Sequence, residues 1–305
     1  SNRFVLGGRN EKFWIVLMLL VMLTACSPLS LIPDSTPLPT QEPTSTSILT
    51  PTPRLNDGIT LTDTQEVVNK MRALCCDDDW WDHLSAAEYK YSEEVSNGDE
   101  SVVGAAFLDS LDAVGEKFDV NEYFMVLTHL APEVGYVLDY VYYAPGGFGA
   151  PYMYARPEGE PTFSNYSAYQ NAGVENFLSH IQVDDTAEGY YELELLSIMG
   201  EQFYMSWHAA YDDWEVVSSR ERLDAIIELM NEGHNPLTEE QVEAALKLDI
   251  TPSVKFEGDK VRVQILVFTK WGGFYERVYT IDRNFPHQMI EDDIQLIPYN
   301  CGIVF

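Results

Sequence analysis

The chain has 305 residues, with 18 Lys and Arg against 49 Asp and Glu, so its formal net charge at pH 7 is −31. That excess excludes a nucleic-acid-binding protein that works through its own basic surface, because affinity for phosphate comes from Lys and Arg that displace condensed counterions. A hydrophobic content of 46%, with 12% aromatic residues, also excludes a wholly disordered polyanion, since most of the chain has enough apolar surface to form a core.

The first 25 residues have the pattern of a secretory signal peptide. Arg3, Arg9 and Lys12 precede an uninterrupted apolar run from residue 13 to residue 23. As a helix, that run would be about 17 Å long, which is too short to cross the roughly 30 Å hydrocarbon core of a bilayer. The pattern therefore predicts an export signal over residues 1–25 and not a permanent membrane span.

The segment ends with Leu23, Thr24, Ala25 and Cys26, which resemble the lipobox of bacterial lipoproteins. The resemblance implies that the Cys26 sulfur receives a diacylglyceryl group and that signal peptidase II cuts before this residue. It also implies a mature protein that is held in the cell membrane by acyl chains such as palmitate and that faces outside the cytoplasm. Two acyl chains are sufficient for stable attachment, so the folded part needs no contact of its own with the bilayer.

Residues 26–58 contain this cysteine and a predicted stalk. Among residues 27–58, 7 are Pro and 11 are Ser or Thr. Frequent proline removes backbone donors and favours polyproline II, and few large apolar residues are left to pack. The segment is therefore predicted to be a disordered tether, with a reach between roughly 30 Å as a random coil and roughly 100 Å as polyproline II.

Residues 59–305 are predicted to form a single globular domain, since no repeat and no second low-complexity linker divides them. This part carries 14 Lys and Arg against 45 Asp and Glu. An anionic membrane repels a domain of that charge, so charge and stalk both favour display away from the surface. The alternative is that the acidity serves only solubility.

Apolar residues recur at helical spacing in five segments of this domain. Capping-box patterns precede the first segment, at Asp63 to Glu66, and the fourth, at Ser218 to Glu221. The predicted helices cover residues 63–74, 99–117, 165–180, 218–231 and 238–248.

Strand-like runs joined by short turns make up much of the remainder. Short turns permit only antiparallel pairing, because a parallel crossover needs a dozen or more residues. The fold class is therefore predicted to be α+β, with an antiparallel sheet built from hairpins and several helices packed on one face. The predicted strands cover residues 123–130, 136–144, 190–198, 203–210, 254–257, 260–270 and 274–282.

Once lipid has modified Cys26, three cysteines remain, namely Cys75, Cys76 and Cys301. Disulfides persist outside the cytosol. A bond from Cys301 to one member of the adjacent pair would join the first helix to the C-terminal end and, in the chain-entropy model, would stabilise the fold by roughly 5 kcal/mol. A Cys75–Cys76 bond and three free thiols are the alternatives.

Two polar segments are candidates for chemistry. Residues Asp77 to His83 place oxygen ligands in a row, but they lack the spacing and the glycine of an EF-hand loop, so no metal site is predicted there. His208 is followed by Asp212, and a carboxylate near an imidazole is the minimum for general acid–base catalysis. No nucleophile motif, zinc-protease motif or phosphate-binding glycine loop accompanies this pair, so the catalytic residues stay unassigned and no cofactor is predicted.

Seven aromatic residues lie within nineteen positions around the glycine-rich loop 144–151. On a strand, Tyr140 and Tyr142 project from one face, and Tyr152 and Tyr154 share a face of the next strand. If exposed, such rings form a stacking platform for sugar rings or a peptide; if buried, they belong to the core. The predicted ligand-binding residues are Tyr142, Phe148, Tyr152 and Trp271.

These observations favour a non-catalytic binding or adhesion module on the outside of the cell membrane. Its expected partners are the membrane, through the N-terminal lipid, and an extracellular glycan or peptide, with no nucleic acid. The first alternative is an extracytoplasmic hydrolase that acts on glycan or peptidoglycan through two carboxylates or through His208 and Asp212. The second is a structural assembly subunit of the envelope, which would expose a large apolar patch.

Overall fold

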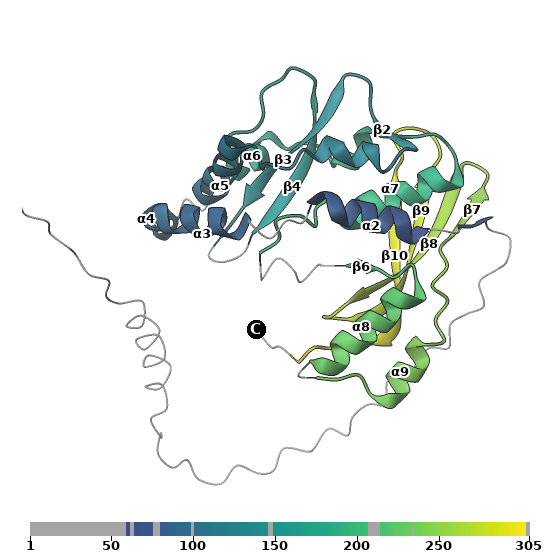
Figure 1. Ribbon diagram of the computed structural model, residues 1–305. Helices are drawn as coiled ribbons and strands as arrows, with labels where there is room; N and C mark the ends of the chain where they lie inside the picture. Colours follow the sequence, from purple (N-terminus) through teal and green to yellow (C-terminus); the bar gives the residue numbers. More distant parts are fainter. Residues whose placement is uncertain are drawn as a thin grey trace, which may run out of the picture. The chain divides into compact units, whose positions relative to one another are not determined.

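The structure, a computed structural model, describes residues 59–61, 64–75, 80–98, 101–145, 149–206, 214–233 and 235–302 (Figure 1). Its helices and antiparallel sheets confirm the predicted α+β class. The predicted signal peptide, Cys26 and the stalk lie outside the described residues.

In the described part of the chain, the largest sheet has six antiparallel strands in the order β1-β7-β8-β9-β10, with β6 paired to β8 beyond the end of β7. The predicted hairpins β7–β8 and β8–β9 are confirmed, and Gly258 has the positive φ of 68° that the first turn requires. The long strand β10 was not predicted, because three consecutive acidic residues interrupt its apolar pattern. The strands are β1 (Ile59–Thr60), β6 (Glu215–Val216), β7 (Ser253–Glu257), β8 (Lys260–Thr269), β9 (Gly273–Asp282) and β10 (Met289–Pro298).

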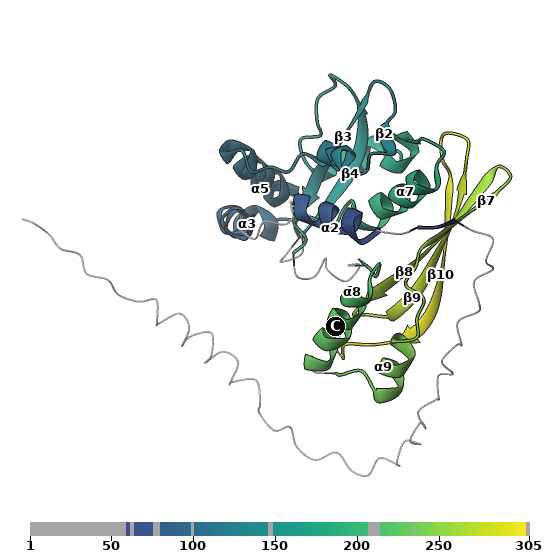
Figure 2. The same ribbon diagram turned by 45° about the vertical axis from the view of Figure 1, so that its right-hand side comes forward.

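Helices cover both faces of this sheet, so the prediction of helices on one face is wrong. Val263 and Ile265 of β8 belong to one core cluster, whereas Leu266 and Phe268 belong to another. The first cluster includes helix α7 (Ala187–Met199), and the second includes α8 (Arg220–Glu232) and α9 (Glu239–Ala245). The C-terminal half of β8 has apolar side chains on both faces of the sheet. Helices therefore pack against each face (Figure 2).

The N-terminal half adds helices and two short two-stranded sheets to the first core cluster. One sheet pairs β2 with β5, and the other is a hairpin of β3 and β4. The elements are α2 (Thr64–Cys75), α3 (Trp80–Lys90), α4 (Ser92–Ser96), α5 (Ser101–Val114), the 3-10 helix η1 (Val120–Met125), β2 (Leu130–Pro132), β3 (Tyr136–Tyr143), β4 (Ala150–Pro157), α6 (Tyr166–Ala172), the 3-10 helix η2 (Phe177–His180) and β5 (Ile181–Val183).

Three predicted strands are wrong. Residues 190–198 form most of helix α7, which begins after Thr186, whose side chain accepts the backbone N–H of Gly189 at 3.0 Å. This helix is buried on nearly all sides, so its apolar residues do not form the single stripe typical of a surface helix. Glu192 and Glu194 alternate with apolar residues, which is the pattern expected of a strand. Residues 123–130 form the end of η1 and the start of β2, and the described residues 203–206 contain no strand.

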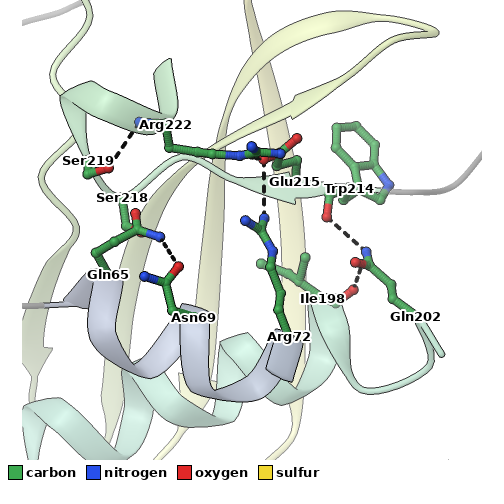
Figure 3. Close-up of polar contacts among 10 residues, drawn as sticks. All are labelled: Gln65, Asn69, Arg72, Ile198, Gln202, Trp214, Glu215, Ser218, Ser219 and Arg222. Carbon is green, nitrogen blue, oxygen red and sulfur yellow. Dashed lines mark hydrogen bonds and ion pairs between the residues drawn. The ribbon is translucent and has the colours of Figure 1, made fainter. Parts of the chain in front are cut away.

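Polar contacts join α2 to β6 and α8 (Figure 3). The carboxylate of Glu215, on β6, accepts hydrogen bonds from Arg72 of α2 at 3.3 Å and from Arg222 of α8. Ser218 donates its hydroxyl to Gln65 of α2 at 2.7 Å. Residues 143 and 153 positions apart in the sequence are therefore joined by side-chain contacts between α2 and the β6–α8 segment.

The N-terminus of α8 is one residue later than predicted. The N-cap is Ser219, whose hydroxyl oxygen accepts the backbone N–H of Arg222 at 3.1 Å (Figure 3). Ser218, the predicted cap, contacts α2 instead. Helix α9 begins with a capping box, in which Thr238 and Gln241 form reciprocal bonds.

Candidate functional site

The β3–β4 hairpin sorts its tyrosines onto two opposite faces. In the antiparallel register, Val141 lies opposite Tyr152. Because successive side chains of a strand alternate, Tyr140 and Tyr142 point to the inner face, and Tyr152 and Tyr154 point to the outer face. The predicted sharing of faces within each strand is confirmed, and the pairing register shows that the two groups face away from each other.

Tyr142 is a core residue, so the prediction that it borders a ligand surface is wrong. It is 1% exposed, and its hydroxyl donates to the backbone oxygen of Tyr204 at 2.6 Å. Its ring lies 4.7 Å from that of Phe107 of α5, centroid to centroid. A Cβ atom at Gly104 of α5 would lie 1.7 Å from the backbone oxygen of Tyr142, so only glycine permits this helix to lie directly on β3. The inner face of β3 is thus covered by α5.

On the outer face, five half-buried aromatic rings form a cluster that we call the tyrosine platform. The rings of Tyr143 and Tyr166 stack with centroids 4.2 Å apart and planes at 20°. Tyr152 lies 4.8 Å from Tyr166 and 6.4 Å from Tyr169, and Phe163 lies 6.0 Å from Tyr169. The platform therefore draws its rings from β3, β4 and the segment that contains α6 (Figure 1).

Local sequence explains why α6 supplies two of these rings. The helix starts at Asn165, whose side chain accepts a backbone N–H of the first turn. It ends at Gly173, which adopts the left-handed conformation with φ 60°, so the single helix predicted over residues 165–180 is interrupted there. Tyr166 and Tyr169 are three residues apart and lie on one face of the helix.

The hydroxyls of Tyr152 and Tyr169 stay protonated at physiological pH. Burial, followed by the neighbouring Tyr166, raises the pKa of Tyr152 to about 12. Burial and the charge of Glu201 raise the pKa of Tyr169. Glu201 is itself held by the hairpin, because its carboxylate accepts the backbone N–H of Met153 at 2.6 Å. The site combines neutral rings with a carboxylate whose position is fixed.

Of the four predicted ligand-binding residues, the structure places Tyr152 in the platform. Trp271 lies in the turn between β8 and β9 of the main sheet, where the Lys270 ammonium is 5.4 Å from its ring centroid. Phe148 lies outside the described residues, as do His208 and Asp212 of the alternative catalytic pair.

Cys301 carries a free thiol, so the structure does not contain the predicted bond from Cys301 to the first helix. Cys301 packs against the core cluster of α8 and α9, whereas Val68 and Met71 of α2 belong to the cluster on the opposite face of the sheet. The sheet therefore separates the two segments. Cys76 and the side chain of Cys75 lie outside the described residues.

Sequence reasoning missed a buried polar cluster between α7, β9 and β10. Glu194 of α7 is 0% exposed, and neither of its carboxyl oxygens has a hydrogen-bond partner among the described residues. Arg277 of β9 is 6% exposed, and its guanidinium bonds both oxygens of Asp293, at 2.8 and 2.9 Å. The same guanidinium lies 3.1 Å from Glu291 and 4.1 Å from the ring centroid of Trp214. The sequence signal was the pair of glutamates inside the apolar run 190–199.

The environments of these carboxyl groups differ. Burial raises the pKa of Glu194 well above its ordinary value, with a further rise from the charge of Glu291, while Arg277 acts in the opposite direction. A buried acid with a raised pKa near other carboxyl groups resembles the arrangement that glycoside hydrolysis uses. However, Glu194 has no exposed surface, so no substrate reaches it in this conformation. The cluster therefore bears on stability and not on catalysis.

Two histidine–carboxylate pairs, which the sequence analysis did not identify, lie at the two ends of the β2–β5 strand pair. His129 Nδ1 lies 2.7 Å from Asp184 Oδ2 at one end, and His180 Nδ1 lies 2.7 Å from Glu133 Oε2 at the other. The hydrogen bond to Asp184 raises the pKa of His129. The nearby hydroxyl of Thr186 donates to Asp184 at 2.5 Å and caps α7, so it is not positioned as a nucleophile. These pairs join the two strands.

Among the described residues, no group of three or more His, Cys, Asp or Glu side chains is arranged to hold a metal ion. Within the same ranges, none of the helices combines the length and the apolar character needed to cross a bilayer. No family model, no curated protein and no solved structure matches the chain.

Proposed function

We propose that this protein is a lipid-anchored binding module on the outside of a bacterial membrane and that the tyrosine platform is its ligand-binding surface. The observation that carries the proposal is the gathering of five half-buried rings on the outer face of β3, β4 and α6. Stacked aromatic rings left open to water are typical of surfaces that bind ligands with flat apolar faces.

The proposed ligand class is a glycan. The C–H face of a sugar ring stacks on a tyrosine ring, while its hydroxyls hydrogen-bond to polar groups at the edge, such as the phenols and the carboxylate of Glu201. The ring spacing argues against a cage for a quaternary ammonium group. Such a cation needs ring faces on several sides, whereas Tyr143 and Tyr166 contact each other at 4.2 Å with no gap between them.

Membrane display is the other part of the proposal and depends on the lipobox. We expect that Cys26→Ser in the cell leaves an uncleaved precursor or releases the protein from the membrane, because the acylated sulfur is lost. Fractionation with intact-mass measurement checks this. A Cys26→Ser protein that remains acylated, membrane-bound and shortened would contradict lipid anchoring without affecting the proposed glycan site.

Glycan binding is tested by removing one ring of the platform. An array of defined oligosaccharides selects a ligand, and calorimetry then measures its affinity for the full folded domain. Tyr166→Ala is expected to weaken binding about ten-fold, because one lost stacking contact corresponds to roughly 1.4 kcal/mol. Tyr166→Phe keeps the ring and is expected to retain most of the affinity.

The matched control is Tyr89→Ala on α3, where an 88% exposed tyrosine stands outside the platform. This variant is expected to bind like the unchanged protein. Two results would contradict the proposal: no oligosaccharide on the array binds, or Tyr89→Ala weakens binding as much as Tyr166→Ala.

A further inference from the structure

Strand β10 forms an open edge of the main sheet. In the described part of the chain, it pairs with β9 alone, from Met289 opposite Ile281 to Pro298 opposite Gly273, while β1 lies at the other edge. All residues from 290 to 295 are exposed. The outer side of an edge strand presents backbone N–H and C=O groups with no ladder partner, and such a row is a template for one more strand.

The side chains of β10 restrict which strand this edge accepts. Glu291, Asp292 and Asp293 occupy its middle. Arg277 holds Glu291 and Asp293 on one face of the sheet, whereas Asp292 points to the other face. On that face Asp292 stands between Ile290, which is 68% exposed, and Ile294, which is 36% exposed.

A second copy of β10 does not fit this edge. Antiparallel pairing of two copies about their acidic middle would place carboxylates opposite carboxylates, and like charges directly across a ladder destabilise it. The complementary partner has a basic side chain opposite the acidic middle and apolar side chains that contact the isoleucines. Charge complementarity thus points to a different chain.

We infer that β10 binds an extended segment of another protein by adding it as a further strand of the sheet, and that this segment has a basic residue with apolar residues two positions before and after it. Backbone hydrogen bonds to the outer edge of β10 provide the attachment. Asp292 provides selectivity for lysine or arginine, and Ile290 and Ile294 contact the apolar residues. This surface is separate from the tyrosine platform and does not depend on the glycan proposal.

A fluorophore-labelled synthetic peptide with Val-Thr-Lys-Thr-Val at its centre is the probe, because its valines and its lysine lie on one face of an extended strand. Anisotropy at physiological salt is expected to show saturable binding to the full domain. Binding is expected to be absent when Glu replaces the central Lys, and also when Pro replaces both Thr residues, because these prolines keep the charge but remove backbone N–H groups and disfavour the extended strand conformation. Hydrogen exchange of the complex is expected to show added protection in β10.

Asp292→Lys is expected to weaken binding of the lysine peptide about five-fold or more, since it places like charges across the new ladder. The matched control is Glu228→Lys, the same change of charge at an exposed position of α8. It is expected to change the affinity less than two-fold. Equal loss of affinity in both variants, equal binding of the proline-containing peptide, or protection confined to other strands would each overturn the inference in favour of nonspecific attraction to an acidic protein.

Discussion

Replacing Arg277 with methionine is expected to lower the free energy of unfolding by about 1–3 kcal/mol at neutral pH. Arg277 is 6% exposed and contacts Asp293 with two hydrogen bonds. Methionine would fill much of the space but would leave the carboxylates of Asp293 and Glu291 without their counter-charge, beside a buried acid. Urea or guanidinium denaturation of the folded domain measures this loss of stability. The free energy of unfolding is expected to depend on denaturant concentration with the same slope in both proteins.

Two further variants separate the role of charge from that of geometry at this position. Arg277→Lys keeps a positive charge but cannot bond both oxygens of Asp293 at once, so we expect a smaller yet clear loss of stability. Arg262→Met makes the same replacement at an exposed position of the neighbouring strand β8, and we expect a change within about 0.5 kcal/mol. If Arg277→Met unfolds at the same denaturant concentration as the unchanged protein, the cluster contributes nothing to stability.

The hairpins of the main sheet could be predicted because their information is local. Val261, Val263 and Ile265 alternate with polar residues, and Gly258 marks the turn before them. Strand β10 follows the same physical rules but exposes Ile290 and carries an acidic middle. As an edge strand, it has no second neighbour that would require an apolar pattern, so its sequence does not resemble that of a buried strand.

Helix α7 could not be recognised from local pattern. A helix with one buried side shows an apolar stripe, but α7 is surrounded by the sheet and the N-terminal elements, and nearly every position is buried. Glu192 and Glu194 then produce an apparent period of two. In the folded chain the carboxylate of Glu192 accepts the backbone N–H of His129 at 2.8 Å. The carboxyl group of Glu194 has no hydrogen-bond partner among the described residues.

The platform was half predictable for a related reason. Tyr152 is found by the density of aromatic residues around the hairpin, and strand periodicity gives its face. Which face is buried depends on α5, whose Gly104 contacts the backbone of Tyr142. Tyr166 and Tyr169 join the site only because α6 folds back over the outer face, which no local pattern indicates.

Glu194→Met is expected to raise the free energy of unfolding by about 1–4 kcal/mol at pH 7, because it replaces a buried acid without a hydrogen-bond partner by an apolar side chain of similar length. Burial raises the pKa of Glu194 in the folded chain well above its ordinary value of 4.5. Between these two pKa values, the folded chain holds a proton that the unfolded chain has lost. The unchanged protein therefore loses stability as pH rises through this window, by up to about 1.4 kcal/mol per pH unit from this group.

Denaturation at pH values from about 5 to about 8 measures how the free energy of unfolding changes with pH. Glu194→Met is expected to make this pH dependence smaller. Glu194→Gln also removes the ionisable group and is expected to flatten the slope, but it buries an amide with no partner and is therefore expected to be less stable than Glu194→Met. Glu188→Met, at an exposed position in the first turn of the same helix, is expected to leave the slope in place. If Glu194→Met destabilises the protein and the slope persists, Glu194 is ionised and paired in the folded chain, and a buried ion pair with Arg277 would take the place of the protonated acid.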